Sequence, residues 1–396
     1  MPVIERIGHF HADMKHWRHD IHAHPEMAFK EHRTSDLIAR TLEKFGVEVH
    51  RGLAGTGVVG TLRAGSSARA IGLRADMDAL PIREKGDRAH ASIHDGIMHA
   101  CGHDGHTTML LGAARYLAET RNFDGVVHFI FQPAEENECG GQKMVNDGLF
   151  DRFPVEAVYG MHNWPGIPVG SFGVCAGPIM AADDKFEIVI SSRGAHAAMP
   201  HLGDDPIVAA ASMIGAIQTI VSRTANPEEK VVVSITQIHG GNTWNIVPEE
   251  VVLRGTCRYF DPGLRKVLED AIARVSTGVA AAHGVQTTFS YYKPIPPAVN
   301  AERPTAAATR AAAMVVGEAN VRRNVVPSMG TEDFAFMLAA RPGCYIWIGN
   351  GPIVDGVGLH SARYDFNDAI LPLGASYWSK LVESVLAPRE ARAPYP

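Results

Sequence analysis

The spacing of apolar and polar residues predicts alternating helices and strands in the first part of the chain. Apolar residues at helical intervals predict helices over 3–46, 106–120 and 140–150. Short apolar runs that stop at turn-forming or charged residues predict strands over 70–81, 126–136 and 156–163. Strands that alternate with helices are typical of an α/β domain whose sheet has parallel character.

The pattern changes near residue 183 and changes back near residue 296. The predicted order between them is strand, helix, two strands, helix and strand, over 184–200, 205–223, 230–241, 249–261, 264–284 and 285–297. This β-α-β-β-α-β order is that of the ferredoxin-like fold. We therefore predict an α/β domain from 1–182 and 296–396, interrupted by an inserted α+β domain at 183–295. A strand is also predicted over 344–350, and the tail at 387–396 is predicted to be loosely held.

The composition of the chain indicates which kinds of binding partner and which cellular compartment to expect. The net charge is −6 and there is no basic run, so nucleic acid is not an expected partner. The five cysteines are widely spaced without a CxxC pair, which suits a reducing, cytoplasmic compartment better than a disulfide framework. The N-terminus has no apolar signal region, and no window of 18 consecutive apolar residues occurs. We expect no membrane partner.

A glycine motif offers a nucleotide-binding alternative. Gly55–Gly60 reads GTGVVG and matches GxGxxG, with Asp76 near the distance at which a ribose-binding acid is expected. That motif must open a helix, whereas here it leads into an apolar run and a Gly-Ser-Ser turn. The pattern therefore favours strand and turn, and a nicotinamide-dependent oxidoreductase remains a weak alternative.

The stretch MHACGHDGH (98–106) allows three interpretations. Cys101 and His103 lie just before a predicted helix, in a loop that glycines can fold around an ion. A thiolate and an imidazole suit zinc or another borderline cation. A reactive thiol with a histidine base needs an orienting group and an oxyanion hole, and neither is visible nearby. The third interpretation is a polar loop without chemistry.

Acidic and imidazole side chains follow several predicted strands. Carboxyl ends of parallel strands share one edge of a sheet, where open α/β sheets bind ligands. Adjacent buried carboxylates repel each other unless a cation neutralises them, and one can then ligate while the other acts as a base. The side chains expected at this edge are Asp78, Glu135, Glu136 and His162, with Cys101 and His103 beside them. His360 lies in a loop near the C-terminus.

The inserted domain contributes polar residues that suit an anionic ligand. His196 and His201 follow a predicted strand, Asn245 lies in a loop, and Arg258 lies in a strand. Arginine can hold a carboxylate, and asparagine can bond a carbonyl or carboxylate oxygen. Each of these residues taken alone is typical of an ordinary polar surface.

Taken together, the motifs resemble the M20D metallopeptidase/amidohydrolase family, which includes hippurate hydrolases, N-acyl-amino-acid hydrolases and plant auxin-conjugate hydrolases. The resemblance runs from 18–26 (RHDIHAHPE) to 365–368 (DFND). Its motifs are MHACGHDGH, PAEE, MHN, GAHAAMPH, NIVPEEVVLRGTCRYFD, GTEDFAFM and LHSARYDFND. It implies a metal-dependent exopeptidase-like catalytic domain with an inserted ferredoxin-like domain that serves as lid and dimerisation domain.

The resemblance also implies roles for individual residues. Two divalent ions per subunit, zinc or manganese and alternatively cobalt or nickel, would be bound by Cys101, His103, Glu136, His162 and His360. Glu135 would be the general base. His196, which related enzymes take from the partner subunit, would polarise the substrate carbonyl, and Asn245 and Arg258 would hold a carboxylate.

The implied reaction is hydrolysis of an N-acyl-L-amino acid with an aromatic or bulky acyl group by a cytoplasmic homodimer or larger homo-oligomer. A dipeptidase or aminopeptidase on the same fold is the main alternative, and a non-catalytic metal- or peptide-binding protein is a lesser one.

The wider family has His-x-Asp where this chain has Asp76-Met77-Asp78. Asp78 is therefore a catalytic candidate of open role, and the roles of His99, Asp104, His106 and His201 are also open.

Overall fold

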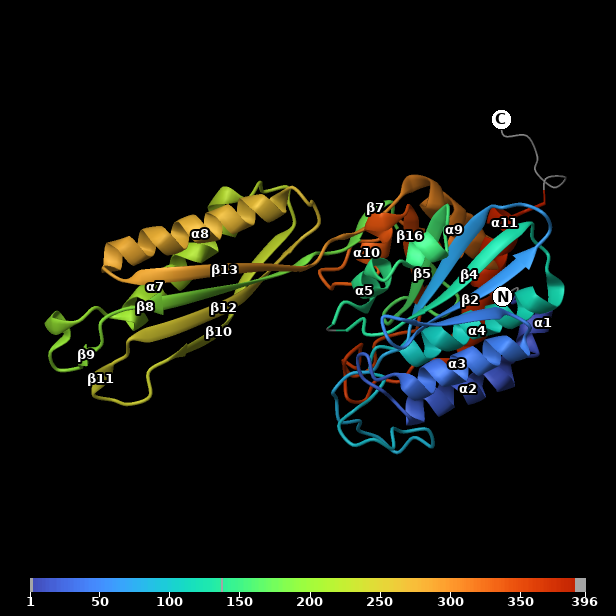
Figure 1. The fold of residues 1–396 in the computed structure, drawn as a ribbon, viewed down its shortest axis with the longest axis horizontal. Coiled ribbons are helices and arrows are strands. Elements are labelled where there is room, and N and C mark those ends of the chain that lie inside the picture. The colour runs from blue at the N-terminus through green and yellow to red at the C-terminus, as the bar shows by residue number, and fades with distance from the viewer. Residues whose placement is uncertain (1–2, 137, 389–396) are drawn as a thin grey trace. The chain divides into compact units, whose positions relative to one another are not determined.

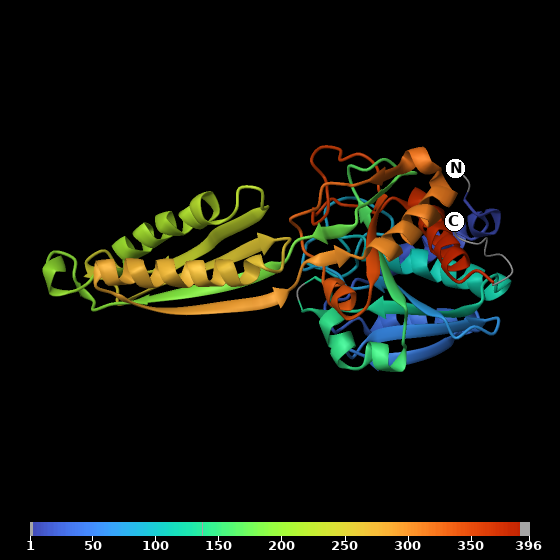
Figure 2. The same cartoon turned by 90° about the horizontal axis from the view of Figure 1, so that it is seen from above.

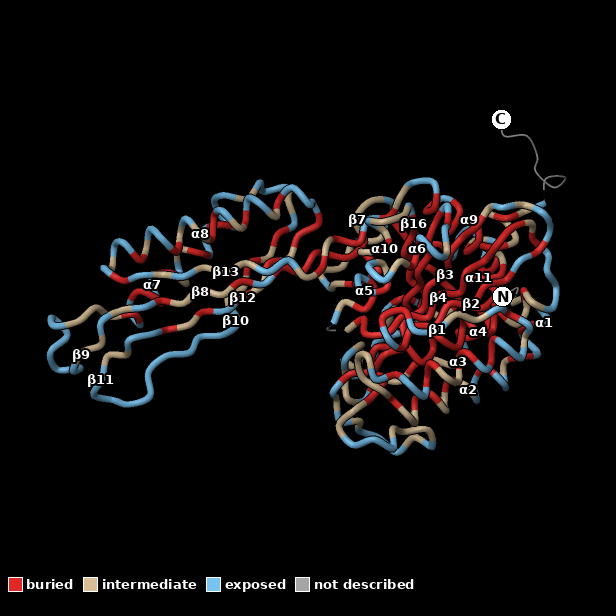
Figure 3. The backbone as a smooth tube through the Cα atoms, viewed as in Figure 1, coloured by how far each residue is buried: buried red, intermediate tan, exposed pale blue. Residues whose placement is uncertain are grey.

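A computed structural model describes residues 3–136 and 138–388 (Figure 1). The chain forms two compact units. The first contains the described residues up to Ile179, Ala298–Val326 and the described residues from Glu332 onward. The second contains Met180–Pro297 and the short segment Pro327–Thr331. Each unit has its own apolar core (Figure 3).

The first unit is built on an eight-stranded mixed sheet with the order β1-β2-β4-β3-β5-β16-β6-β15. The four central strands, β4, β3, β5 and β16, are parallel to one another, whereas β1 and β2 pair antiparallel beside them. The carboxyl ends of the central strands therefore lie at one edge. The strands are β1 (Glu48–Leu53), β2 (Gly57–Ala64), β3 (Ala70–Asp76), β4 (Gly125–Gln132), β5 (Ala157–Trp164), β6 (Phe172–Val174), β15 (Val321–Arg323) and β16 (Gly343–Gly349).

Helices pack on this sheet and on one another. Helix α4 contacts α2, α11 and strand β3, and α11 contacts α9. In Figure 1, α2, α3 and α4 run together below the strands. The helices are α1 (Glu5–Gly8), α2 (His11–Ala23), α3 (His32–Lys44), α4 (His103–Thr120), α5 (Gly140–Asn146), α6 (Leu149–Arg152), α9 (Glu302–Val316), α10 (Ala335–Ala340) and α11 (Leu371–Val385), with short 3₁₀ turns at Glu318–Asn320 and Asp368–Ile370.

The prediction of one continuous helix over 3–46 is wrong, because three separate helices occupy that stretch. The largest break, between Ala23 and His32, contains Pro25, which has no amide hydrogen to donate within a helix. The helix predicted over 140–150 is likewise interrupted before Leu149, where Gly148 has a φ of 88°. Most of the tail predicted to be loose, from residue 389 onward, lies outside the described residues.

The second unit has the predicted ferredoxin-like arrangement. Its antiparallel sheet has the order β10-β12-β8-β13, and two helices pack together on it (Figure 2). The elements are β8 (Asp183–Ser191), α7 (Pro206–Thr219), which runs on into a π turn at Ile220–Thr224, β10 (Val231–Gly240), β12 (Glu250–Tyr259), α8 (Leu264–His283) and β13 (Gln286–Ile295). Strands β9 (Ala195–His196) and β11 (Ile246–Val247) pair with each other in a short two-stranded antiparallel sheet, the β9–β11 ribbon. Pro200–Leu202 is a 3₁₀ turn. The remaining strands, β7 (Gly177–Met180) and β14 (Ala298–Asn300), pair with each other.

Two sequence questions are answered by the fold. Gly57 and Gly60 lie within β2, which forms an antiparallel hairpin with β1, so the GxGxxG match does not open a helix. Among the described residues, one helical stretch, Pro206–Thr224, is long and apolar enough to cross a membrane. Core helices pass the same test, and Met213 and Ile217 of this stretch are fully buried in the core of the second unit.

Candidate metal centre

The parallel strands bring four widely separated parts of the sequence to one edge of the sheet. Asp76 ends β3 and Asp78 follows it, Glu135 and Glu136 follow β4, and His162 lies near the end of β5. The backbone N–H of His360, in the loop after β16, donates to the carbonyl of Ala100 at 2.8 Å. Gly102, at a φ of 95°, immediately precedes α4 and allows the sharp entry into that helix.

The five predicted metal ligands converge there in overlapping groups. In each group, one donor atom per residue lies within 4.8 Å of the donor atoms of the others. The Cys101 sulfur is 3.3 Å from Nε2 of His162, and Nε2 of His360 is 3.3 Å from a Glu136 oxygen. The groups that contain at least two of the predicted ligands are Cys101–His103–His162, Cys101–Glu136–His360 and His103–Glu135–Glu136. Cys101 therefore belongs to two groups of different composition.

The two buried histidines are oriented by hydrogen bonds from their other ring nitrogen. Nδ1 of His103 lies 3.1 Å from Oδ1 of Asp78, and Nδ1 of His162 donates to the Asn163 carbonyl at 2.6 Å. Such partners fix the ring and leave Nε2 to face the ion, as in known metal sites. Nε2 of His103 and Oε1 of Glu136 are buried without a hydrogen-bond partner among the described residues. Asp78 is thus placed to orient a ligand.

A second layer of polar residues surrounds the ligands. His106 Nδ1 donates to Asp76 at 2.6 Å, and its Nε2 accepts from the backbone N–H of Asn163 at 3.0 Å. The His106 ring lies 4.4 Å from that of His162, centroid to centroid. His106, whose role the sequence left open, therefore supports the strand that carries His162.

Glu135 lies in a buried loop with little freedom. Its side chain is 8% exposed and accepts a hydrogen bond of 3.3 Å from the backbone N–H of Asp333. The backbone N–H of Glu136 donates to Asp78 at 3.0 Å. Burial, reinforced by the charges of Glu332 and Glu136, raises the pKa of Glu135 well above that of an ordinary glutamate.

One arginine holds together the acids behind Glu135. The Arg74 guanidinium is fully buried and contacts Asp76 at 2.6 Å, Glu332 at 2.9 Å and Asp333 at 3.1 Å. Burial raises the pKa of Asp333 to about 8 even though Arg74 opposes the shift. Glu135, Glu332 and Asp333 lie close together at this edge, and a bound cation would offset the repulsion between such buried carboxylates.

The donor set fits a divalent metal ion. Thiolate, imidazole and carboxylate donors together suit zinc and other borderline first-row ions. Burial, with the nearby Glu136 and Glu135, raises the pKa of the Cys101 thiol well above its usual value, so without a cation the thiol stays protonated. A raised pKa is the opposite of what a cysteine nucleophile needs. Because Cys101 also lies in two candidate ligand groups, the metal-ligand interpretation is favoured over the nucleophile.

A separate buried ion network links the N-terminal helix α2 to the start of α4. Arg18 and His22 of α2 both contact the Asp104 carboxylate, at 3.4 Å and 2.8 Å. Burial alone would lower the pKa of His22, but Asp104 and Glu84 raise it to about 9. Asp104 thus anchors the helix whose first residue is His103. His99 is also buried, with no hydrogen-bond partner for either ring nitrogen among the described residues.

This network predicts that stability falls in mildly alkaline solution. Because the folded chain binds a proton on His22 more tightly than the unfolded chain, the stabilisation is complete below pH 6.5 and is lost as pH rises through about 9. We expect the free energy of unfolding to fall over that range by up to about 3 kcal/mol. Denaturant unfolding of wild type and His22→Gln from pH 6 to 9.5 measures it. A difference between them that stays constant with pH would contradict the prediction.

The remaining predicted site residues lie in the second unit. His196 lies in β9 and Asn245 in the turn just before β11, and both are exposed. The N–H of Ala197 donates to the Asn245 carbonyl at 2.9 Å. The ends of the second unit around β9 and β11 are largely exposed (Figure 3). Arg258, on β12, lies 3.3 Å from Asp183. His201 is exposed in a 3₁₀ turn. The structure thus brings together Asp78, Glu135 and the five predicted ligands, and holds His196, Asn245 and Arg258 in the other unit.

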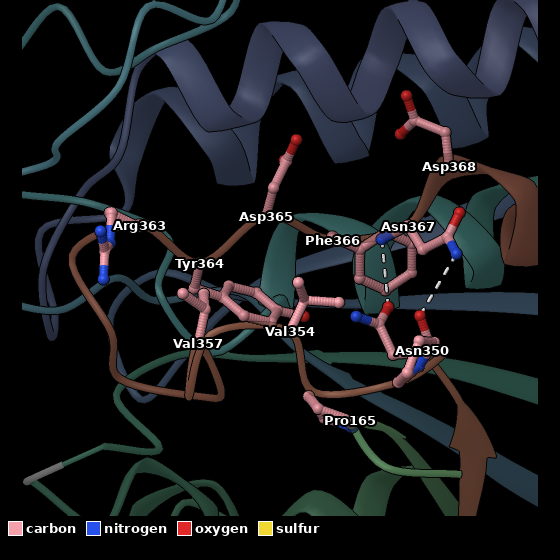
Figure 4. A pocket seen from close by; sticks show the side chains of 11 residues that line it. Pro165, Asn350, Val354, Val357, Arg363, Tyr364, Asp365, Phe366, Asn367 and Asp368 are labelled. Atoms are coloured by element: carbon pink, nitrogen blue, oxygen red, sulfur yellow. Dashed lines mark hydrogen bonds between the residues drawn. The ribbon is translucent and has the colours of Figure 1, made fainter. Parts of the chain in front are cut away.

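A cavity of about 550 Å³ lies in the loops that follow β5 and β16 (Figure 4). Asn367 makes two hydrogen bonds to Asn350 across it, and the carboxylates of Asp365 and Asp368 point out of it toward Arg18. Its lining residues are Pro165, Asn350, Pro352, Val354, Val357, Arg363, Tyr364, Asp365, Phe366, Asn367 and Asp368. The cavity is therefore formed partly by the loop that carries His360, but no candidate metal ligand lines it.

Comparison with known proteins identifies the family. Residues 72–384 match the model of peptidase family M20/M25/M40. The chain belongs to this family. Hippurate hydrolase of Campylobacter jejuni is 39% identical to it over 381 residues, which are 96% of this chain and 98% of that protein. N-acetylcysteine deacetylase of Bacillus subtilis is 38% identical over 379 residues, which are 95% of this chain and 98% of that one.

A solved structure extends the likeness to the fold. A dinuclear metal-binding peptidase of family M20 from Bacillus subtilis is 35% identical and superimposes with a TM-score of 0.83, over 96% of this chain and 99% of that one. The comparisons confirm the predicted family and the α/β fold class, and they identify the chain as an M20-family amidohydrolase. The non-catalytic alternative is correspondingly disfavoured.

Sequence reasoning missed several residues that build the centre. Arg74, Glu332 and Asp333 form the buried ion cluster behind Glu135, yet they come from distant parts of the chain. Arg74 lies inside an otherwise apolar strand, and a charged residue there was the available signal. Glu332 and Asp333 were visible only as part of the GTEDFAFM motif.

Proposed function

We propose that this M20-family enzyme hydrolyses the amide bond of N-acyl-L-amino acids, releasing a carboxylic acid and a free amino acid. The observation that carries the proposal is the pair of candidate ligand groups that share Cys101, with Glu135 buried beside them. The proposed ligands of two divalent ions, zinc or manganese by preference, are Cys101, His103, Glu136, His162 and His360. Ions in such a site polarise the scissile carbonyl and acidify a water molecule.

The residues of the chain would carry the proton through the reaction. Glu135 takes a proton from the attacking water and later delivers it to the leaving amine, so one carboxyl group acts first as base and then as acid. The Asp333 N–H fixes one of its oxygens, which leaves the other for the water. Asp78 acts indirectly, by orienting His103 and the Glu136 backbone.

The second unit offers the groups proposed to bind substrate. Nδ1 of His196 accepts a hydrogen bond of 3.1 Å from the Ala198 N–H, so in a neutral ring the proton is on Nε2. An exposed Nε2–H can donate to the carbonyl oxygen as it gains negative charge. Asn245 and Arg258 are proposed to hold the carboxylate of the amino-acid half, because a guanidinium and a side-chain amide suit that group.

The acyl group is proposed to be aromatic or bulky, as in hippurate. The two curated relatives are named for different acyl groups, benzoyl in hippurate and acetyl in N-acetylcysteine, at almost equal identity. Assaying hippurate, N-acetyl amino acids and glycyl dipeptides with each metal separates the choices. Hydrolysis of hippurate well above that of glycyl dipeptides supports the proposal, and the reverse order supports the dipeptidase alternative.

We also propose a cytoplasmic homodimer or larger homo-oligomer joined through the second unit. Strand β10 is an edge strand, and its neighbourhood exposes large apolar side chains: Ile207 is 47% exposed, Val208 51% and Ile238 55%. Edge strands and exposed apolar side chains are features that a second copy can cover. Sedimentation analysis at micromolar concentration tests this, and a monomer throughout would contradict it. The cytoplasmic location is supported by five cysteines that form no disulfide.

A further inference from the structure

The loop that carries Glu135 is held by its backbone on both sides. Ala134, just before Glu135, has a φ of 55°, a conformation that non-glycine residues seldom adopt. Its N–H donates to Oε1 of Glu31 at 2.9 Å. On the other side, the N–H of Glu136 donates to Asp78 at 3.0 Å. The Pro133–Ala134 peptide before Glu135 and the Glu135–Glu136 peptide after it therefore each donate to a carboxylate from another part of the chain.

Glu31 is buried more completely than an acid normally is. It has 0% exposure, and its other oxygen accepts a hydrogen bond of 2.7 Å from the Thr56 hydroxyl. Thr56 lies in the turn between β1 and β2, so three separate segments meet at this one carboxylate. Burial raises the pKa of Glu31 to about 7, against the lowering effect of the Thr56 hydrogen bond. A buried acid of this kind costs folding free energy.

Capping of the adjacent helix α3 does not explain why the Glu31 carboxylate is buried. It occupies the position just before α3, where a side chain commonly caps the helix, but its carboxylate makes no capping hydrogen bond. Glu26 binds that helix end instead, accepting from the N–H groups of Arg33 at 3.0 Å and Thr34 at 2.8 Å. The Glu31 carboxylate is directed at the loop of Glu135.

We propose that Glu31 is a positioning residue for Glu135. By fixing the Ala134 peptide in its unusual conformation, Glu31 sets the direction in which the Glu135 side chain leaves the loop. The inference rests on the proposed function, in which Glu135 is the general base. Misplacement of such a group by about 1 Å can cost roughly a hundredfold in rate.

The test compares Glu31→Leu with Glu31→Gln. Leucine leaves the Ala134 N–H without an acceptor, and we expect kcat to fall about a hundredfold, with KM and bound metal within twofold of wild type. Glutamine can still accept from Ala134 with its oxygen and donate to the Thr56 hydroxyl with its amide, so most of kcat is expected to return. Hydrogen exchange at the Ala134 amide should accelerate in Glu31→Leu and stay slow in Glu31→Gln.

Glu26→Leu is the matched control, because it removes a neighbouring carboxylate that holds only the start of α3. We expect it to lower the melting temperature while leaving kcat and the Ala134 amide unchanged. If Glu31→Leu does not fold, Thr56→Val removes one of the two donors to Glu31 and should lower kcat in the same direction with faster exchange at Ala134.

Two results would overturn the inference. One is a Glu31→Leu enzyme with wild-type kcat, and the other is an equal loss of kcat in Glu31→Leu and Glu26→Leu, which would mean general loosening. Glu135→Gln separates this inference from the proposed function. If Glu135→Gln is inactive and Glu31→Leu is normal, only the role of Glu31 is wrong. If Glu135→Gln is active, both are wrong.

Discussion

Replacing Glu135 with glutamine is expected to lower kcat for amide hydrolysis by about a thousandfold, within the range that a positioned acid–base group contributes. The amide has nearly the shape of the carboxyl group but cannot take a proton from water at neutral pH. In the metal-free protein, burial and neighbouring acids disfavour the charged form of Glu135, so there the uncharged amide should be at least as stable as wild type. Steady-state kinetics and thermal unfolding measure the two effects.

The control is Glu138→Gln, an exposed acid in the same loop region. We expect this variant to keep wild-type kcat. Metal analysis of both proteins should give the wild-type content, since neither residue is a proposed ligand. Wild-type turnover by Glu135→Gln with its metal intact would remove Glu135 from the mechanism.

Loss of the metal ions should lower activity by a comparably large factor. The metal content of ligand variants should depend on which of the two ligand groups contains the replaced residue. Because Cys101 belongs to both, Cys101→Ala should lose metal from both. His162→Ala and His360→Ala each weaken one group and should each retain part of the metal. Elemental analysis after gel filtration reports the metal content of each variant.

Prolonged chelation of the wild-type enzyme should abolish activity, and zinc, manganese, cobalt or nickel should restore it.

His201→Ala serves as the control for the histidine variants, because His201 is exposed in the second unit and outside every candidate ligand group. It should retain wild-type metal content. A Cys101→Ala protein with full metal content would refute the shared position of the cysteine. Activity that survives chelation, in a protein without detectable metal, would refute the centre as a whole.

The sequence could predict this centre because parallel strands impose a simple rule. Glu135, Glu136 and His162 each lie at or just after the carboxyl end of a strand, and such ends meet at one edge. The order of elements also sufficed for the ferredoxin-like unit, since its six main elements follow one another without interruption by the other unit. The family resemblance then assigned roles that spacing alone had left open.

The sequence could not predict contacts that depend on packing between distant segments. In the sequence, Glu31 is simply a polar residue before a predicted helix. No neighbouring residue indicates that its carboxylate accepts a hydrogen bond from the distant Ala134 N–H. Arg74 and Asp333 are separated by 259 positions, and their contact exists only once the sheet has formed. The break between α2 and α3 was marked by Pro25, yet its length depended on interactions such as the 2.9 Å hydrogen bond from the Ala79 N–H to the Glu26 carbonyl.

The place of β16 in the sheet has a consequence for synthesis on the ribosome. This strand, Gly343–Gly349, lies between β5 and β6, although the whole second unit is translated before it. The second unit can fold while the first is still incomplete, because domains generally fold as units during translation. The sheet of the first unit stays divided between β5 and β6 until β16 has emerged, and His360 emerges later still. Metal binding by the complete set of proposed ligands would therefore follow the synthesis of β16 and of the loop that carries His360.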